Sequence, residues 1–304
     1  TKSFFMLSLM QVFYYTAYNY SLLFLTQTLK VNDKIATELF LFATLASVPV
    51  FFITGQLANT GNKKKIYLVL VSIIAALLVP TYQFIANNAN PELMAFNEKK
   101  ITLEVNTLHC GSQFNPLNTA IFVKSCDISK NIMSKASLTY DVVHNSSDIA
   151  MIKIDGKTFE VKDITSKVLN ENKQDLSKIS KSFNEFLVQQ KYPAQADEKS
   201  FSYGAVFFGV WLLMSFAAAL LSLANSIAVE LFKAKSRVLA YSFSYNFTSI
   251  IGGLAPSVSF ALVTNFGNIL AGTAFAITIM VVGVLINIFS LKFAEKQPID
   301  YEGY

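Results

Sequence analysis

The chain has 304 residues, of which 53% are hydrophobic and 15% are charged, and its formal net charge is +5 at pH 7. Soluble domains carry about 25% charged residues, so this composition argues against a soluble globular protein and predicts a membrane protein. The excess positive charge lies entirely outside residues 87–200, in the apolar part of the chain, and gives no reason to propose nucleic acid as a partner.

Five long runs without Asp, Glu, Lys or Arg mark the candidate membrane spans. A helix needs about 20 mainly apolar residues to cross a bilayer. The first four runs each fit one crossing, whereas the fifth, residues 238–291, is long enough for two, with a turn at 264–268. We therefore predict six transmembrane helices, at residues 4–29, 38–59, 66–86, 203–231, 238–264 and 268–291.

Polar side chains recur on one face of the first, fourth and fifth predicted helices. Such groups face the interior of a helix bundle or a cavity, so they are candidates for a substrate path. Tyrosine rings can surround a quaternary ammonium or similar cation; alternatively, the tyrosines pack between helices or form interfacial belts. The candidate substrate-binding residues are Tyr14, Tyr18, Asn19, Asn225, Tyr245 and Asn246.

The loop between the second and third predicted helices, GQLANTGNKKK at residues 55–65, ends in three lysines. Cytoplasmic loops carry an excess of Lys and Arg. Outside residues 87–200, nine basic residues fall on the side of this loop, and only Lys30 and Lys34 fall on the other. We therefore predict a multi-pass protein of a bacterial inner membrane, with both termini cytoplasmic and residues 87–200 extracytoplasmic.

The segment 87–200 has a different composition, with 14 acidic and 14 basic residues. It contains both cysteines, Cys110 and Cys126, and in an exported segment this pair predicts a disulfide. A loop of that size contributes about 3 kcal/mol to stability in the chain-entropy model. Zinc binding is the less favoured alternative, because there is no CxxC pair and His109 has no spaced partner pair.

The same segment shows local signals of a small α+β domain. Residues 100–106 alternate like a half-buried strand. Residues 151–161 alternate on both sides of Asp155-Gly156, which predicts a hairpin. Residues 164–187 carry an apolar stripe at helical spacing, which predicts an amphipathic helix, with a break near Asn172 left open because Asn172 occupies an apolar position.

Two motifs resemble the major facilitator superfamily. Residues 55–64 partly match the loop motif G-x-L-A-D-R-x-G-R-R. The match begins at Gly55 and ends with Lys63 and Lys64, whereas Asn59, Thr60 and Asn62 differ from the motif. The stretch ELFKAKSR, from Glu230 to Arg237, resembles the E-L-F-P-x-x-x-R signature of the metabolite:proton symporters, the proline/betaine symporter group.

The fifth predicted helix extends this second resemblance. Tyr245-Asn246 is followed by Gly252-Gly253 and Pro256, similar to the Y-N…G-G-x-x-P run of that group. The resemblance covers about 190 residues and implies the C-terminal six-helix half of a twelve-helix transporter. The implied domains are helices one to three at 1–86, the inserted domain at 87–200, and helices four to six with a tail at 201–304. We expect the N-terminal half to be absent here or encoded separately, since the chain starts with Thr.

Several motif residues suit conformational change. Glu230 and Arg237 could form a latch that changes as a transporter rocks; alternatively, Arg237 anchors the chain beside lipid headgroups. Gly252-Gly253 permits close helix approach, and Pro256 can kink its helix, although both features also fit static packing.

The sequence leaves two functions open. The first is the half of a secondary transporter that carries a small polar metabolite or osmolyte, with a proton as the coupling ion and the N-terminal half as partner. The second is a membrane-anchored binding or sensory protein on a scaffold that no longer transports. There is no convincing nucleophile–base pair, phosphate-binding loop, dinucleotide fingerprint or metal cluster in the sequence, so we predict neither an enzyme nor a cofactor.

The predicted topology can be tested by placing a cysteine at position 64 (Lys64→Cys). Because that loop carries three lysines, we expect a membrane-impermeant thiol reagent to leave the cysteine unmodified in intact cells and to label it after lysis. Labelling of intact cells would refute the topology.

Overall fold

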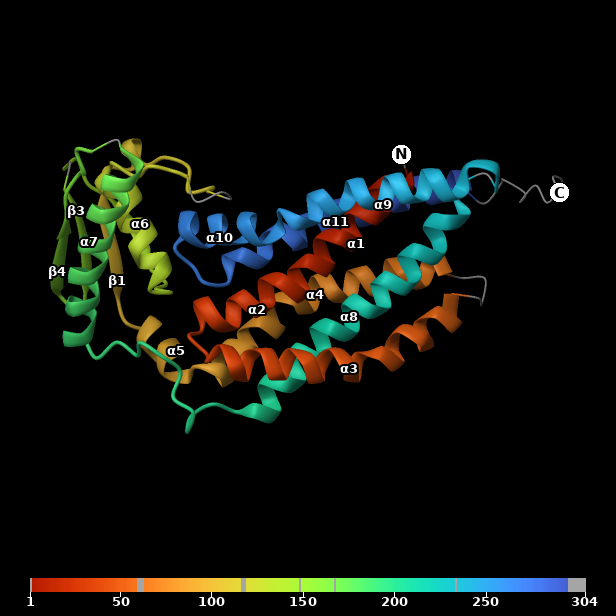
Figure 1. Ribbon diagram of the computed structural model, residues 1–304, viewed down its shortest axis with the longest axis horizontal. Coiled ribbons are helices and arrows are strands. Elements are labelled where there is room, and N and C mark those ends of the chain that lie inside the picture. Colours follow the sequence, from red (N-terminus) through yellow and green to blue (C-terminus); the bar gives the residue numbers. More distant parts are fainter. Residues whose placement is uncertain are drawn as a thin grey trace.

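The computed structural model describes residues 2–58, 63–115, 119–147, 149–166, 168–232 and 234–294, and it contains a long helical body and a small mixed sheet (Figure 1). The sheet and its helices lie at one end of the longest axis, beyond the ends of the long helices. The start of α1 and the turn between α8 and α9 lie at the opposite end. The protein is therefore elongated, with its polar domain at one end of an apolar body.

The helical body begins with one long helical path in four parts. These are α1 (Lys2–Tyr15), the π-helical η1 (Thr16–Tyr20), α2 (Ser21–Leu23) and the π-helical η2 (Phe24–Thr28). The path continues through α3 (Asp33–Leu57) and α4 (Lys63–Ala89), and after the inserted domain through α8 (Tyr203–Glu230) and η5 (Ala234–Ser236). It ends with α9 (Arg237–Gly253), α10 (Ala255–Phe266), η6 (Ala271–Thr273) and α11 (Ala274–Ala294).

In the described part of the chain, four helical stretches are long and apolar enough to cross a membrane. They are Asp33–Leu57, Lys65–Ala89, Tyr203–Glu230 and Arg237–Phe266. These match the second to fifth predicted spans. The first predicted span is divided by its two π-helical turns. The sixth predicted span continues into residues 287–291, whose side chains are not among those described. A helical membrane protein is thus supported, and six spans remain a prediction.

Exposed apolar side chains cover the outer surface of these helices. Phe52 is 64% exposed on α3, Ile73 is 44% exposed on α4, and Phe243 is 70% exposed on α9. Soluble proteins rarely expose large contiguous apolar surfaces. Contact with lipid explains this surface, because apolar side chains that face lipid are not exposed to water.

The helices of the body pack in six extensive pairs. α3 packs against α8, α1 against α9, and α4 against both α8 and α11. α1 also contacts α8 and α11. The first path and α8 therefore lie at the centre of the body, between the other helices.

The inserted domain is built on a four-stranded sheet in the order β2-β1-β3-β4. Its strands are β1 (Ile101–Val105), β2 (Asp141–His144), β3 (Ala150–Ile154) and β4 (Lys157–Val161). β1 pairs in parallel with β2 and antiparallel with β3, and β3 pairs antiparallel with β4. The remaining elements are α5 (Pro91–Asn97), the 3₁₀ turn η4 (Thr107–His109), α6 (Ser125–Lys135) and α7 (Leu169–Gln189).

The structure confirms the predicted strand at 100–106 and the predicted hairpin at 151–161. The hairpin turns at Asp155 and Gly156, which both have positive φ, as a tight type I′ turn requires. The alternating burial of β1 reflects one face packed against the helices.

The predicted helix at 164–187 begins later and is unbroken. α7 starts at Leu169, so Ile164 and Val168 precede it. Asn172 is fully buried in the first turn, where its Nδ2 donates to the carbonyl of Phe122 at 2.8 Å. The polar residue therefore links the helix to the neighbouring segment, and α7 has no break near Asn172, a possibility that the sequence left open.

The inserted domain docks on the outer ends of the helical body through residues 134–140. The backbone N–H of Tyr140 donates to the carbonyl of Gly267 at 2.8 Å, and Thr264 Oγ1 donates to Ser134 Oγ at 2.8 Å. On the other side, Lys30 Nζ donates to the carbonyl of Lys135 at 2.7 Å. One short segment thus holds both the end of η2 and the end of α10.

The lysines in this interface are partly desolvated. Burial lowers the pKa of Lys30, whose ammonium binds the end of α6. Burial also lowers the pKa of Lys130, although nearby Asp127 opposes the shift. Lys130 Nζ donates to the carbonyl of Asn265 at 3.4 Å, so α6 contributes a charged contact to the same docking surface.

Gly267→Ala tests this docking. Gly267 has φ +62°, and a Cβ placed there would lie 2.8 Å from the backbone oxygen and ring of Tyr140. We expect alanine to destabilise the interface by about 1–3 kcal/mol and to speed hydrogen exchange at the Tyr140 amide. Gly204→Ala is the matched control, because a Cβ at Gly204 meets nothing within 4 Å. Equal exchange in the two variants would contradict the docking.

Candidate functional site

The tyrosines of the first helical path form the centre of the candidate site. The rings of Tyr14 on α1 and Tyr18 on η1 stack with centroids 4.6 Å apart. Tyr15 contacts Tyr14 edge-on, with centroids 5.8 Å apart. Tyr18 also interacts with Thr44 and Ser47 of α3. This face therefore presents aromatic surface and hydroxyl groups together.

α8 and α9 bring further polar groups to the same region. Tyr241 on α9 donates its hydroxyl to Asn225 Oδ1 on α8 at 2.8 Å. The rings of Tyr241 and Tyr245 lie 5.9 Å apart, and Tyr245 lies near Tyr14. We call Tyr14, Tyr18, Asn225, Tyr241 and Tyr245 the tyrosine cluster.

The close crossing of α1 and α9 explains why the cluster forms. A Cβ built on Gly252 would lie 2.9 Å from the backbone of Gln11 and 2.7 Å from the ring of Tyr15. Only glycine allows this approach, which brings Tyr245 on α9 towards Tyr14 on α1. Gly253, the next residue, is exposed.

The tyrosine cluster has the chemistry of a binding site. Its hydroxyl and amide groups can donate and accept hydrogen bonds, and its ring faces can attract a cation. None of its five members carries a formal charge at neutral pH. All five are half-buried, so the cluster lies at the surface of this body and remains accessible to a ligand or a partner.

Two predicted site residues lie apart from these contacts. Asn19 and Asn246 are exposed, and Asn246 Nδ2 donates to the carbonyl of Ser242 in its own helix at 2.8 Å. Their part in a substrate path stays a prediction. Thr44 and Ser47 were missing from the predicted site, whereas Tyr241 lies on the predicted polar face of its helix, one helical turn before Tyr245.

The predicted conformational residues lie at helix junctions. Pro256 stands in the first turn of α10, and the preceding turn at Leu254 separates α9 from α10, where a proline is expected to interrupt a helix. On α3, a Cβ at Gly55 would lie 3.1 Å from Ser222 Oγ of α8. Arg237 Nε donates to the carbonyl of Phe232 at 3.3 Å, and its pairing with Glu230 remains a prediction. Residues 59–62 and the side chains of Lys63 and Lys64 lie outside the described residues.

A buried polar network beside the cluster had no signal in the sequence. Ser21 and Tyr82 share a hydrogen bond, and both hydroxyl oxygens lie within 3.1 Å of the carbonyl oxygen of Thr16, which accepts from the hydroxyl that does not donate to the other. Thr16 begins the π-helical turn η1, whose wider winding leaves backbone carbonyls available for side chains. Cross-helix hydroxyls therefore satisfy the irregular backbone inside the apolar body, as a membrane requires.

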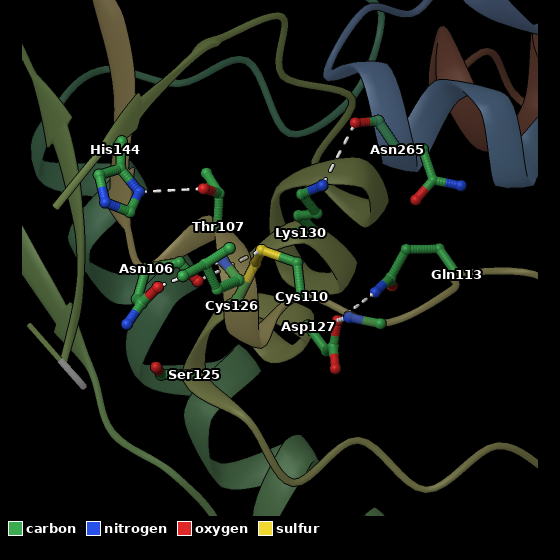
Figure 2. Close-up of a disulfide and its surroundings, with 12 residues drawn as sticks. Asn106, Thr107, Cys110, Gln113, Ser125, Cys126, Asp127, Lys130, His144 and Asn265 are labelled. Carbon is green, nitrogen blue, oxygen red and sulfur yellow. Dashed lines mark hydrogen bonds between the residues drawn. A yellow bond between two sulfur atoms is a disulfide. The ribbon is translucent and has the colours of Figure 1, made fainter. Parts of the chain in front are cut away.

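The predicted disulfide is confirmed: Cys110 and Cys126 are bonded, with Cα atoms 5.3 Å apart (Figure 2). Cys126 lies in the first turn of α6, next to Asp127. Asp127 Oδ1 accepts hydrogen bonds of 2.8 Å from the Gly111 backbone N–H and from Gln113 Nε2. Burial raises the pKa of this carboxyl, and the bond from Gly111 opposes the shift.

Comparison with protein-family models, with curated proteins and with solved structures gave no match.

Tyr241→Phe tests the link between α8 and α9 in the tyrosine cluster. Removing the hydroxyl bonded to Asn225 should cost about 1 kcal/mol and lower the melting temperature of the purified protein by about 2–4 °C. Tyr203→Phe is the control, because Tyr203 is 51% exposed at the start of α8. An unchanged melting temperature for Tyr241→Phe would argue against this contact.

Proposed function

We propose that this chain forms one half of a secondary active transporter for a small polar metabolite or osmolyte. The observation that carries the proposal is the pairing of its helices. For this comparison the spans are numbered in chain order: span 1 is α1 to η2, span 2 is α3, span 3 is α4, span 4 is α8, span 5 is α9 with α10, and span 6 is α11.

The contacts between spans form a symmetric pattern. When each of the first three spans is swapped in name with its counterpart among the last three, most of the extensive contacts map onto other observed contacts. Under the exchange of 1 with 4, 2 with 5 and 3 with 6, the 1–5 contact becomes the 4–2 contact, and both are extensive. The 3–4 contact becomes the 6–1 contact, and the 1–4 and 3–6 contacts map onto themselves. The α10–α11 contact departs from the pattern, because α3 and α4 share no contact of similar extent in the described residues.

This symmetry favours transport over a passive anchor. Successive spans run in opposite directions, so spans 1 and 4 are antiparallel, as an inverted relation between the two groups of three requires. Inverted repeats of three helices occur within each half of major facilitator transporters, with the substrate site at repeat interfaces. The tyrosine cluster has members on spans 1, 4 and 5, and Tyr18 also reaches span 2, so it lies where the two groups of three meet.

The cluster also supports a substrate class. Tyrosine rings with nearby amide and hydroxyl groups suit a small zwitterion or a quaternary ammonium compound. The predicted spans carry no Asp, Glu, Lys, Arg or His near their middle, so the charges that couple transport to protons are expected on the N-terminal half. The partly matched motifs at 55–64 and 230–237 agree with this assignment to the metabolite:proton symporter group.

The docking of the inserted domain favours the second candidate function, a membrane-anchored sensory or binding protein. Residues 134–140 hold the outer ends of spans 1 and 5 together, which suits a rigid receptor as well as a transporter. Uptake separates the two candidates. A sensory protein expressed with its partner half would bind ligand without accumulating it in cells.

The test is uptake of labelled proline and betaine by cells that express this chain together with the N-terminal half. Tyr18→Ala, Tyr245→Ala and Asn246→Ala each remove a polar group or an aromatic face expected to line the cavity. Losing about 1–2 kcal/mol of binding should lower uptake roughly tenfold at equal membrane expression. Leu285→Ala should leave uptake unchanged, because Leu285 is 51% exposed on α11.

If all three cavity variants take up substrate normally, these residues serve packing and the site lies elsewhere. If the unaltered protein accumulates neither compound nor any other small zwitterion, the transport proposal fails.

A further inference from the structure

The inserted domain contains one segment that lacks its usual charge. Between Glu104 and Lys124 the sequence has no Asp, Glu, Lys or Arg, although residues 87–200 otherwise carry 28 charged residues, 14 of each sign. A surface in contact with water alone has no need for such a gap in charge. The segment joins β1 to α6 and contains the loop closed by the disulfide.

Large apolar side chains on this segment are exposed. Leu108 is 84% exposed, Phe114 is 44% exposed, and Ile121 is 40% exposed. Single exposed apolar residues are ordinary on any protein. Three on one uncharged segment of a highly charged domain indicate a contact with an apolar surface.

The position of the segment identifies that surface. In Figure 1 the described parts of the loop, drawn in yellow, leave the domain and run back towards the helical body, on the side of α10. The long helices lie along the same axis, which is the direction of the membrane normal for helices that cross it. The loop therefore points from the domain towards the membrane surface.

The base of the loop is held in place. The disulfide joins its two ends, and Asp127 binds both Gly111 and Gln113 at its start (Figure 2). Lys130, one turn further along α6, binds the carbonyl of Asn265 at the end of α10. The base of the loop is thus fixed relative to the helical body, so little ordering is needed for the apolar side chains near it to meet the bilayer.

We propose that Phe114 and Ile121 rest in the membrane that the helices cross, in the leaflet nearest to the inserted domain, at the level of the lipid headgroups and upper acyl chains. Apolar and aromatic side chains on an uncharged segment suit this interfacial region. The inserted domain then has two supports: the docking of residues 134–140 on the helix ends, and the lipid surface beside α10. The proposal requires only that the helices cross a membrane and does not depend on transport.

Tryptophan fluorescence in lipid vesicles tests this contact. The protein contains one tryptophan, Trp211, which Trp211→Phe removes. In that background Ile121→Trp, and separately Phe114→Trp, places a probe on the loop. We expect a blue-shifted emission that is lost when the vesicles contain lipids brominated near the headgroup.

Two controls define the outcome. Val188→Trp in the same background places the probe on a residue 68% exposed at the end of α7, and its emission should not respond to brominated lipid. The unaltered protein, with Trp211 on the apolar helix α8, shows that the lipids quench a probe inside the bilayer. An intact Cys110–Cys126 disulfide on a non-reducing gel confirms that each variant has folded.

Loop probes that behave like the Val188→Trp probe would overturn the proposal. A blue-shifted emission without quenching would also overturn it, because another protein surface would then cover the loop. Quenching at both loop positions, with no response at Val188→Trp, is the result that supports lipid contact.

Discussion

The arrangement of the helices depends on the crossing of α1 and α9 at Gly252. A side chain at that position would overlap the backbone of Gln11, so the two helices approach as closely as backbones allow. Within a bilayer, helix association relies on such packing, since burying apolar surface away from lipid yields little free energy. This contact brings Tyr245 towards Tyr14 and sets the register between the first and fifth spans.

Local patterns predicted the parts of the fold that are decided by neighbouring residues. The Asp155-Gly156 turn and the alternation of β1 are such cases, because each depends on a few adjacent positions. The parallel strand β2 was missed. All four of its residues are exposed, so the strand has no alternation of buried and exposed positions that its sequence could reveal. The π-helical turns were also missed. In the first turn, the carbonyl of Thr16 accepts a hydrogen bond from Tyr82, a residue more than sixty positions away that local patterns do not connect to it.

The candidate site was predicted in part for the same reason. Tyr14, Tyr18 and Tyr245 were found because polar residues in an apolar helix stand out singly, and Asn225 was found in the same way. Which of these groups meet depends on the helix crossings, and helical periodicity does not contain that information. Asn19 and Asn246 are polar like the members of the cluster but make none of its contacts. Thr44 and Ser47 of α3 interact with Tyr18, although no polar periodicity on that helix predicted them.

Residues 134–140 bind the end of η2 in the first group of three helices and the end of α10 in the second. A covalently attached domain thus braces the two groups against each other at the ends nearest to the sheet. Sliding or tilting of one group past the other would break hydrogen bonds to Gly267, Thr264 and Lys30 at the same moment. The mechanical consequence is a stiff helical body, in which large movements are confined to the tyrosine face and to the α9–α10 turn at Leu254.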